Sequence, residues 1–435
     1  MFVIFIQILT TTEDFLYCQH QKMSYLCDFK KKLIIVKPNL FSMKNHFLRL
    51  SFIVLMMGCV TFVSAQKEGK REKKEKKAAV TEQPVAPKER KFHISDYIQV
   101  GGSINSQYEY TYKDNGENID PTQSSVFQIR RARLDLKGTI TPRIEFRLQG
   151  DFANSPKLID AFVKFKFCRY INLQVGQFKI PFTLENPYAP IDLELADNAQ
   201  VISALSGYSD VTGISSYANG REIGLMINGT LLQFERDGQK YPLLDYALGV
   251  FGGNGINVKK DNMAKDIAGR IEFHPFLKHL SLSGSAYWGR YAMGDDLGDG
   301  LRLRCAGGAQ YKDENLIVRG EYVWGKTDIA RTDVDLITPY VQNLETHGFY
   351  VIASYWFRFG WGGNSTVQQK LRPVLRYDFY QKDLTLENGA STHYSAGIDW
   401  WPEKHVQLRL QYTLKQNQVN KHLGHSALAM VSVKF

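Results

Sequence analysis

The sequence predicts an all-β fold, a transmembrane antiparallel β-barrel of about 16 strands formed by residues 92–435. Three observations carry this prediction. Polar and apolar residues alternate along many short segments, an export signal precedes them, and the chain ends on an alternating segment whose last residue is aromatic. A strand that contacts lipid with one face and a wet interior with the other produces this alternation.

Residues 143–152 show the alternation clearly. Ile144 and Phe146 fall on one face of the segment, while Arg143 and Arg147 fall on the other. Segments of this kind predict strands at 97–112, 126–138, 143–153, 159–167, 171–178, 220–232, 243–252, 266–275, 279–291, 301–312, 315–327, 346–358, 371–382, 392–402, 405–416 and 426–435. Their number is even, as in bacterial outer-membrane barrels.

The lengths of the connections predict how the barrel is oriented. Outer-membrane barrels have short periplasmic turns and longer external loops. If the first strand leaves the periplasm, the long connections 179–219 and 328–345 are external, and the short turn 139–142 is periplasmic. The breaks at 233–242 and 359–370 are longer than this scheme expects.

The last predicted strand carries a second signal. Ala429, Val431, Val433 and Phe435 are in phase, and Phe435 is the final residue. The segment resembles the C-terminal assembly signal of outer-membrane barrels. Together with export, it predicts the bacterial outer membrane as the location.

The N-terminal region predicts secretion. From Met43, basic Lys44 and Arg49 precede an apolar run, and the small residues before Gln66 form a cleavage site. We interpret residues 43–65 as a signal peptide and residues 1–42 as the product of an upstream start chosen in error. A lipobox-like cysteine, Cys59, is an alternative cleavage point. Residues 66–91 are dense in charge and lack aromatic residues, which predicts a periplasmic linker.

The positive charge does not indicate a nucleic-acid partner. The formal net charge is +10. Residues 1–65 carry seven Lys and Arg against three acids, and residues 66–91 carry ten against five, so about +1 remains from Phe92 onward. The predicted barrel therefore has no basic footprint for nucleic acid.

The sequence offers little sign of an enzyme or a metal site. GxSxG and HExxH do not occur, and no two cysteines have a metal-ligand spacing. The spacing GxxxxGK[ST] occurs once, at 320–327, but inside the predicted strand 315–327 and not between a strand and a helix, as a phosphate-binding loop requires. Of the five cysteines, only Cys168 and Cys305 fall in the predicted barrel. The sequence thus predicts no enzyme, no cofactor and no metal. A barrel enzyme with dispersed residues, or a surface binding protein, remains a less favoured alternative.

A basic cluster at residues 126–138 predicts an anion path. Alternation places Arg131, Arg133 and Lys137 inside, whereas Arg130 is out of phase and requires a bulge, since a lipid-facing arginine at mid-depth costs about 2–4 kcal/mol. The other bases predicted to face inward are Arg143, Arg147, Lys164, Lys166, Arg270, Arg302, Arg304, Arg319, Arg372, Arg376, Arg409 and Lys434. The acids are Asp135, Glu145, Asp151, Asp160, Glu222, Glu272, Glu321 and Asp378. The excess of bases predicts anion preference, although wall arginines could also merely solvate the channel.

The long external connection has the opposite charge. Between Pro181 and Ala218 it contains no Lys or Arg, and its acids are Glu185, Asp192, Glu194, Asp197 and Asp210. It also contains the apolar residues Ile191, Leu193, Leu195, Val201, Ile202 and Leu205. We expect this loop to fold into the barrel, narrow the pore, and place its carboxylates opposite Arg131, Arg133 and Arg147.

The stretches IRRARLDLKG, GDFANSPKLIDAFVKFKF, VGQFKIPFTLEN and NGREIGL resemble the phosphate-selective porin O and P family over about residues 95–435. The resemblance implies a sixteen-strand barrel, a homotrimer in outer-membrane lipid, an inward third external loop, and arginines and lysines that guide small anions such as phosphate. By position, Arg130 and Arg131 match the paired arginines of the family, and Lys179 lies at the entrance to the long loop.

The candidate site residues fall into two sets. The substrate pathway is Arg130, Arg131, Arg133, Arg147, Asp151, Lys164, Lys166 and Lys179. The pore loop is Glu185, Asp192, Glu194 and Asp197. An acidic loop facing an arginine wall is also typical of general porins, so a channel for general or other solutes remains the alternative.

Overall fold

The computed structural model describes residues 97–116, 120–213, 220–236, 238–259, 264–275, 279–294, 297–331, 339–360, 368–387, 389–418 and 423–435. The predicted upstream segment 1–42, signal peptide 43–65 and linker 66–91 lie outside the described residues and remain predictions. No helix among the described residues is long and apolar enough to span a membrane.

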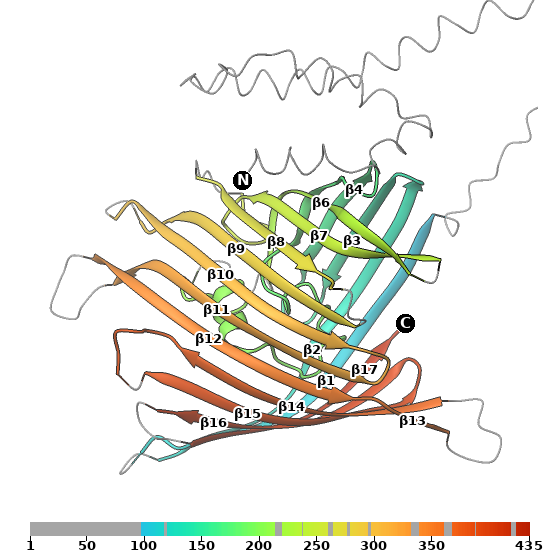
Figure 1. The fold of residues 1–435 in the computed structure, drawn as a ribbon. Helices are drawn as coiled ribbons and strands as arrows, with labels where there is room; N and C mark the ends of the chain where they lie inside the picture. The colour runs from blue at the N-terminus through green and yellow to red at the C-terminus, as the bar shows by residue number, and fades with distance from the viewer. Residues whose placement is uncertain are drawn as a thin grey trace, which may run out of the picture. The chain divides into compact units, whose positions relative to one another are not determined.

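The described residues form one closed antiparallel sheet of seventeen strands and a short helix (Figure 1). The strands are β1 (Ile98–Lys113), β2 (Thr122–Thr141), β3 (Ile144–Asp151), β4 (Lys157–Lys166), β5 (Asn172–Lys179), β6 (Arg221–Arg236), β7 (Gln239–Phe251), β8 (Asp266–Phe273), β9 (Leu280–Ala292), β10 (Asp299–Lys312), β11 (Leu316–Arg331), β12 (Tyr340–Tyr355), β13 (Phe357–Gly360), β14 (Gln368–Gln381), β15 (Ala390–Glu403), β16 (Val406–Asn417) and β17 (Leu423–Lys434). The helix is α5 (Gln200–Leu205).

The barrel closes through β1, which pairs with both β2 and β17. The other strands pair with their neighbours in sequence. At Trp356 one position of the wall is interrupted, because β12 and β13 lie on either side of this residue and both pair with β14. The wall therefore has sixteen strand positions, which confirms the predicted fold class.

Most predicted strands agree with the structure within a few residues, and the differences lie in the connections. Most of the predicted break at 233–242 is strand, because β6 continues to Arg236, β7 begins at Gln239, and these two residues pair. The connection predicted at 328–345 is also shorter than expected, because β11 extends to Arg331 and β12 begins at Tyr340. The sequence did not reveal these strand ends because their side chains are polar on both faces. Beyond the hydrocarbon layer both faces of a strand contact water, so the alternation is lost.

Alternation along each strand separates two surfaces. On β11, Arg319 and Glu321 are buried, while Val318 and Tyr322 on the opposite face are exposed. The same phase places Leu375, Ile398 and Leu410 outside. The outer face thus has the apolar character that lipid requires, and the charged residues face the interior.

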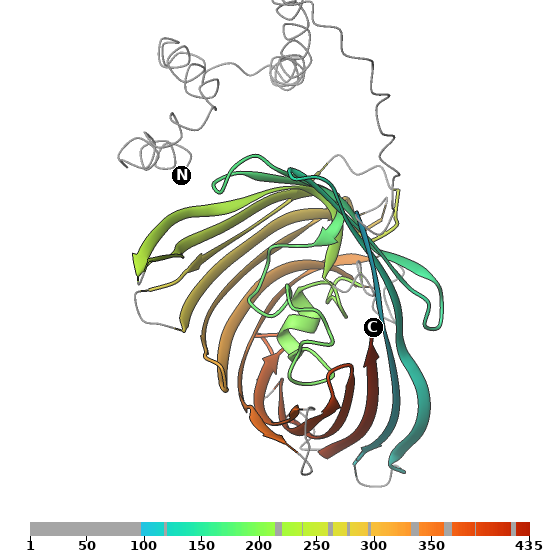
Figure 2. The same ribbon diagram turned by 90° about the vertical axis from the view of Figure 1, so that its right-hand side faces the viewer.

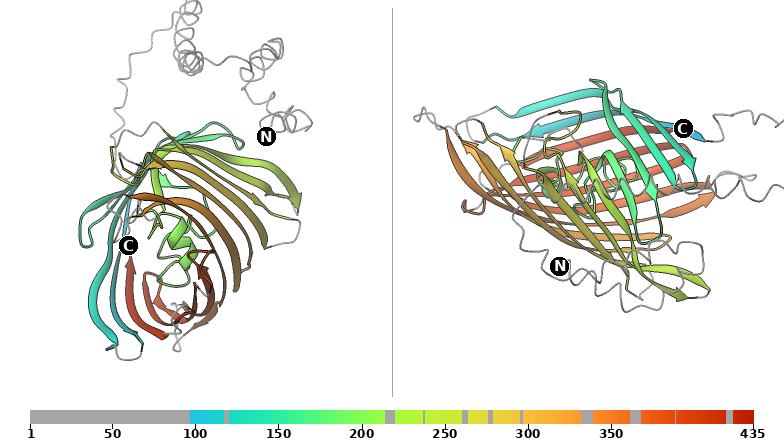
Figure 3. Two further views of the ribbon diagram at one scale, coloured as in Figure 1. Left: turned by 90° about the vertical axis from the view of Figure 1, so that its left-hand side faces the viewer. Right: turned by 90° about the horizontal axis from the view of Figure 1, so that it is seen from above.

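The interior is occupied by the connection between β5 and β6. Figures 2 and 3 show α5 and the loop around it within the ring of strands. Loop residues Leu195, Val201, Ile202 and Leu205 are buried and form one apolar cluster with inward side chains of the wall, including Tyr350. The apolar residues of the long loop thus correctly predicted that it packs against the inside of the barrel.

Candidate functional site

The long loop is held against one side of the barrel by buried arginines. Arg319 Nη2 lies 2.6 Å from Glu194 Oε2, and Arg304 donates hydrogen bonds of 2.7 and 2.8 Å to the two carboxylate oxygens of Asp210. These four side chains are at most 4% exposed. Since a buried charge is costly without a partner, the wall arginines and loop acids stabilise each other.

Two more wall arginines hold the loop through its backbone. Arg372 and Arg409 donate hydrogen bonds of 3.1 and 2.7 Å to the carbonyl oxygen of Leu193. Both also pair with Asp399, at 2.6 and 2.5 Å. The guanidinium groups of Arg372 and Arg409 therefore share one carboxylate of the wall and bind one carbonyl oxygen of the loop.

Asp399 and Asp266 are inward acids that the sequence analysis missed. Asp399 pairs with two arginines, and Asp266 pairs with Arg302 at 2.5 Å. Asp399 lies on the same face of β15 as Trp401, so alternation could have predicted that it points inward. It was missed because it is the only polar residue in the run GIDWW. Asp266 is the first residue of β8, where the boundary of a strand is hard to predict.

Arg130 occupies the bulge that its phase required. Asn105 pairs with Arg131 and Ser106 with Ile129, so Arg130 is the extra residue between them. Its guanidinium donates a 3.1 Å hydrogen bond to Gln107 Oε1 and pairs with Asp197 of the loop. The side chain of Asp197 is half exposed. Desolvation inside the barrel raises its pKa, but the charge and hydrogen bond of Arg130 outweigh this effect and lower the pKa to about 2.

The loop carboxylates are arranged differently from the prediction. Only Asp197 reaches the arginines of β2, and it does so through Arg130. Glu194 and Asp210 pair with the opposite wall, and Asp192 is exposed without an ion pair among the described residues. Glu185 is buried, and its Oε1 accepts a hydrogen bond from Ala199 N at 3.1 Å. The acids thus lock the loop more than they face Arg131, Arg133 and Arg147.

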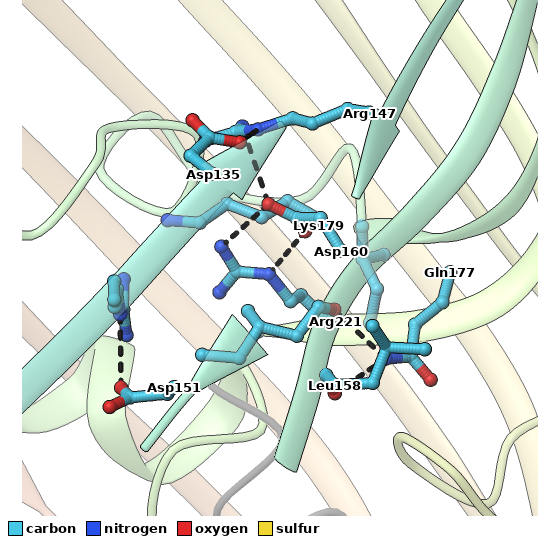
Figure 4. A network of polar contacts seen from close by, with 12 residues as sticks. Asp135, Arg147, Asp151, Leu158, Asp160, Gln177, Lys179 and Arg221 are labelled. Carbon is cyan, nitrogen blue, oxygen red and sulfur yellow. Dashed lines mark hydrogen bonds and ion pairs between the residues drawn. The ribbon is translucent and has the colours of Figure 1, made fainter. Parts of the chain in front are cut away.

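A second polar network covers the wall from β2 to β6 (Figure 4). Asp160 pairs with Arg221 at 2.5 Å and with Arg147 at 3.3 Å, and Arg147 also pairs with Asp135 at 2.9 Å. Nearby, Arg133 pairs with Asp151 at 3.0 Å. Arg221 was not predicted as an inward residue.

Two lysines of the predicted pathway are bound to other groups of the protein. Lys179 Nζ donates to the carbonyl oxygens of Asn186 and Tyr188, each at 2.5 Å, so it fixes the start of the loop. Lys166 pairs with Glu145.

Arg131 and Lys164 differ from the other bases of the pathway. Neither has a carboxylate within ion-pair distance among the described residues, and one buried nitrogen of Arg131, Nη1, has no hydrogen-bond partner there. Both line a cavity of about 760 Å³ between the loop and the end of the barrel where β1 begins and β17 ends. Ten basic and five acidic side chains line this cavity. Uncompensated cations therefore gather on one side of the interior.

Comparisons with known proteins give the family and the fold. The family model of phosphate-selective porin O and P matches residues 98–430. No curated protein matches. Among solved structures, the anion-selective porin from Comamonas acidovorans is 13% identical, with a TM-score of 0.55, and the match covers 78% of this chain and 99% of that one.

Two other solved barrels have similar scores. The outer-membrane channel DcaP of Acinetobacter baumannii is 13% identical with a TM-score of 0.52, and OmpF of Salmonella typhi, in a complex with daunomycin, is 15% identical with a TM-score of 0.51. Each match covers 78% of this chain and 97% of the other. At such identities the likeness establishes the barrel fold, while the family match establishes membership. The chain belongs to the phosphate-selective porin O and P family of outer-membrane porins.

Proposed function

We propose that this porin passes small anions, phosphate among them, by diffusion through a channel whose selectivity arises on the β2–β6 wall. The observation that carries the proposal is the cavity lined by ten basic and five acidic side chains. Fixed charges along a pore determine which sign of ion enters. The name of the structural neighbour from Comamonas, an anion-selective porin, is consistent with this direction.

Arg131 and Lys164 are the residues to which we assign most of the preference. A guanidinium presents a planar set of donors that matches the oxygens of phosphate or carboxylate. In Arg131 one of these donors, Nη1, has no hydrogen-bond partner among the described residues. The arginines paired with Asp266, Asp399, Glu194 and Asp210 contribute less, because a nearby opposite charge cancels their field at a distance.

A general channel is the second candidate. The ion-paired arginines on β10, β11, β14 and β16 favour it, because nearby carboxylates offset most of their charge. A homotrimer in outer-membrane lipid, which the family resemblance implies, is part of the proposal for either candidate. Native mass spectrometry of the purified protein tests the trimer.

Measurement of the reversal potential of purified channels across a potassium chloride gradient tests the anion preference. We expect chloride to permeate more readily than potassium, and added phosphate to reduce the chloride current by competing for the same cations. A reversal potential of the opposite sign refutes the anion preference. Chloride preference without competition by phosphate favours the general channel.

A further inference from the structure

Two tryptophan side chains meet on the inner face of the barrel. Trp356 lies between β12 and β13, Trp401 lies in β15, and their ring centroids are 4.7 Å apart with 40° between the planes. Trp401 shares its phase with buried Asp399, whereas adjacent Trp400 faces outward and is 37% exposed. The aromatic girdles of a barrel contact the membrane interface, which explains Trp400 but not the inward pair.

The pair borders a cavity of about 1110 Å³, here called the tryptophan cavity, which Tyr188 and Ile191 of the loop border from the other side. Both tryptophans are partly exposed. The guanidinium of Arg372 lies 4.7 and 5.2 Å from the two ring centroids. Because Arg372 is held by Asp399 and by the loop, it fixes the rings in place. A rigid aromatic surface costs little conformational entropy when a ligand binds.

The rim of the tryptophan cavity is basic. Its exposed lysines are Lys312, Lys370, Lys404 and Lys434, and none has an ion pair among the described residues. Its acids are fewer: Asp192, Glu403 and Glu194, the last of which is engaged by Arg319. Aromatic surface beside free ammonium groups suits a ligand with an apolar ring face and a negative group.

We propose that the tryptophan cavity binds organic anions that carry an aromatic or pyranose ring together with a carboxylate or phosphate. The ring lies against Trp356 and Trp401, and the lysines of the rim hold the anionic group. This inference rests on the proposed function, since the ligand must reach the cavity through the lumen. Binding in the tryptophan cavity would favour ring-bearing anions over other anions, whereas the β2–β6 wall distinguishes only the sign of the charge.

Current recordings on the full-length channel in planar bilayers test the proposal. Benzoate and glucose 6-phosphate serve as ring-bearing probes, and inorganic phosphate serves as the ringless reference. We expect a ring-bearing probe to interrupt the current for longer than phosphate does. A response to benzoate alone assigns an aromatic ligand, and a response to glucose 6-phosphate alone assigns a sugar ligand. Equal interruptions by all three probes overturn the proposal.

Variants separate binding from a supporting role of the rings. Trp356→Ala with Trp401→Ala should shorten the interruptions about fivefold, the scale of one favourable aromatic contact, while the matched outward variant Trp400→Ala should leave them unchanged. An unchanged duration in the double variant contradicts binding at these rings.

A fluorescence titration covers the case in which the alanine variant does not assemble. Benzoate and glucose 6-phosphate should change the tryptophan emission of the wild-type protein in detergent, and should change it much less in the variant Trp356→Phe with Trp401→Phe. Identical titrations of the two proteins refute the proposal. This measurement needs no ion flow, so its outcome is independent of the reversal potential that tests the proposed function.

Discussion

Arg319 on β11 and Glu194 in the long loop form an ion pair inside the barrel, with 2.6 Å between Nη2 and Oε2 and at most 4% of either side chain exposed. The pair joins residues 125 positions apart in sequence. Breaking a buried pair by removing one partner leaves an uncompensated charge. The position of the loop is therefore expected to depend on this contact more than on any exposed pair.

Glu194→Gln should loosen the loop. Loss of one charge from a buried pair costs about 3–5 kcal/mol, so we expect a lower melting temperature in detergent and noisier single-channel currents. The matched control is Glu345→Gln, which breaks the half-exposed outer pair with Lys326, for which about 0–1 kcal/mol is expected. Equal melting temperatures for the two variants would mean that the ion pair does not hold the loop.

Arg131→Ala and Lys164→Ala should each weaken the anion preference. One unit charge about 4 Å from an ion changes its energy by about 1 kcal/mol in water, so we expect the ratio of chloride to potassium permeability to fall by up to about fivefold. Replacing Lys70 and Lys73, which precede the barrel in sequence, should leave the ratio unchanged. A ratio in Arg131→Ala equal to that of the wild type would refute the assignment.

Arg133 offers a sharper comparison on the same strand. Its charge is paired with Asp151 at 3.0 Å, so the double variant Arg133→Gln with Asp151→Asn removes both charges and should change the reversal potential less than Arg131→Ala does. If the neutralised pair moves the reversal potential further, paired arginines also determine selectivity, and the division of the wall into paired and unpaired cations is wrong.

The contact between Arg130 and Asp197 should persist in acid. The pKa of Asp197 is lowered to about 2, so the stabilisation is complete above the ordinary pKa of an aspartate, near 4, and is lost only as the pH falls through about 2. In a pH titration of conductance, the wild type and Asp197→Asn should therefore still differ at about pH 4 and converge only as the pH approaches about 2. Convergence already near pH 4, the ordinary pKa of an aspartate, would contradict the lowered pKa.

The sequence was sufficient to predict the barrel fold because one physical rule governs most of its strands. Lipid on one side and water on the other impose alternation, and alternation located the strands and required a bulge at Arg130. The rule fails where the backbone is irregular. Arg221 and Glu222 are adjacent and both buried, which strict alternation forbids. Gly176 on neighbouring β5 has a φ of 129°, a conformation that glycine tolerates and that a sequence pattern does not reveal.

The pairing of charges was harder to predict than their inward position. Alternation placed Arg319 inside but could not identify Glu194 as its partner, because that contact forms only when the loop has entered the barrel. A count of inward charges therefore overestimated the number of free cations. The structure reduces the candidates to bases such as Arg131 and Lys164, for which no carboxylate lies close by among the described residues.

Shortening the loop tests its role directly. Replacing residues 181–218 with a few glycines removes α5, the apolar cluster around Val201 and Ile202, and five carboxylates. It also leaves Arg304 and Arg319 without their loop partners. We therefore expect a several-fold higher conductance, because the lumen is wider, and a stronger anion preference, because these guanidinium groups then face water.

The loop deletion must be compared with a variant that keeps the loop in place. Asp192→Asn removes an exposed loop carboxylate that has no ion pair among the described residues, so it should raise the anion preference slightly and leave conductance unchanged. If the deletion variant assembles, as judged by its resistance to detergent, and conducts like the wild type, the loop does not limit the current. If it conducts more but loses anion preference, the loop backbone, and not the freed arginines, determines selectivity.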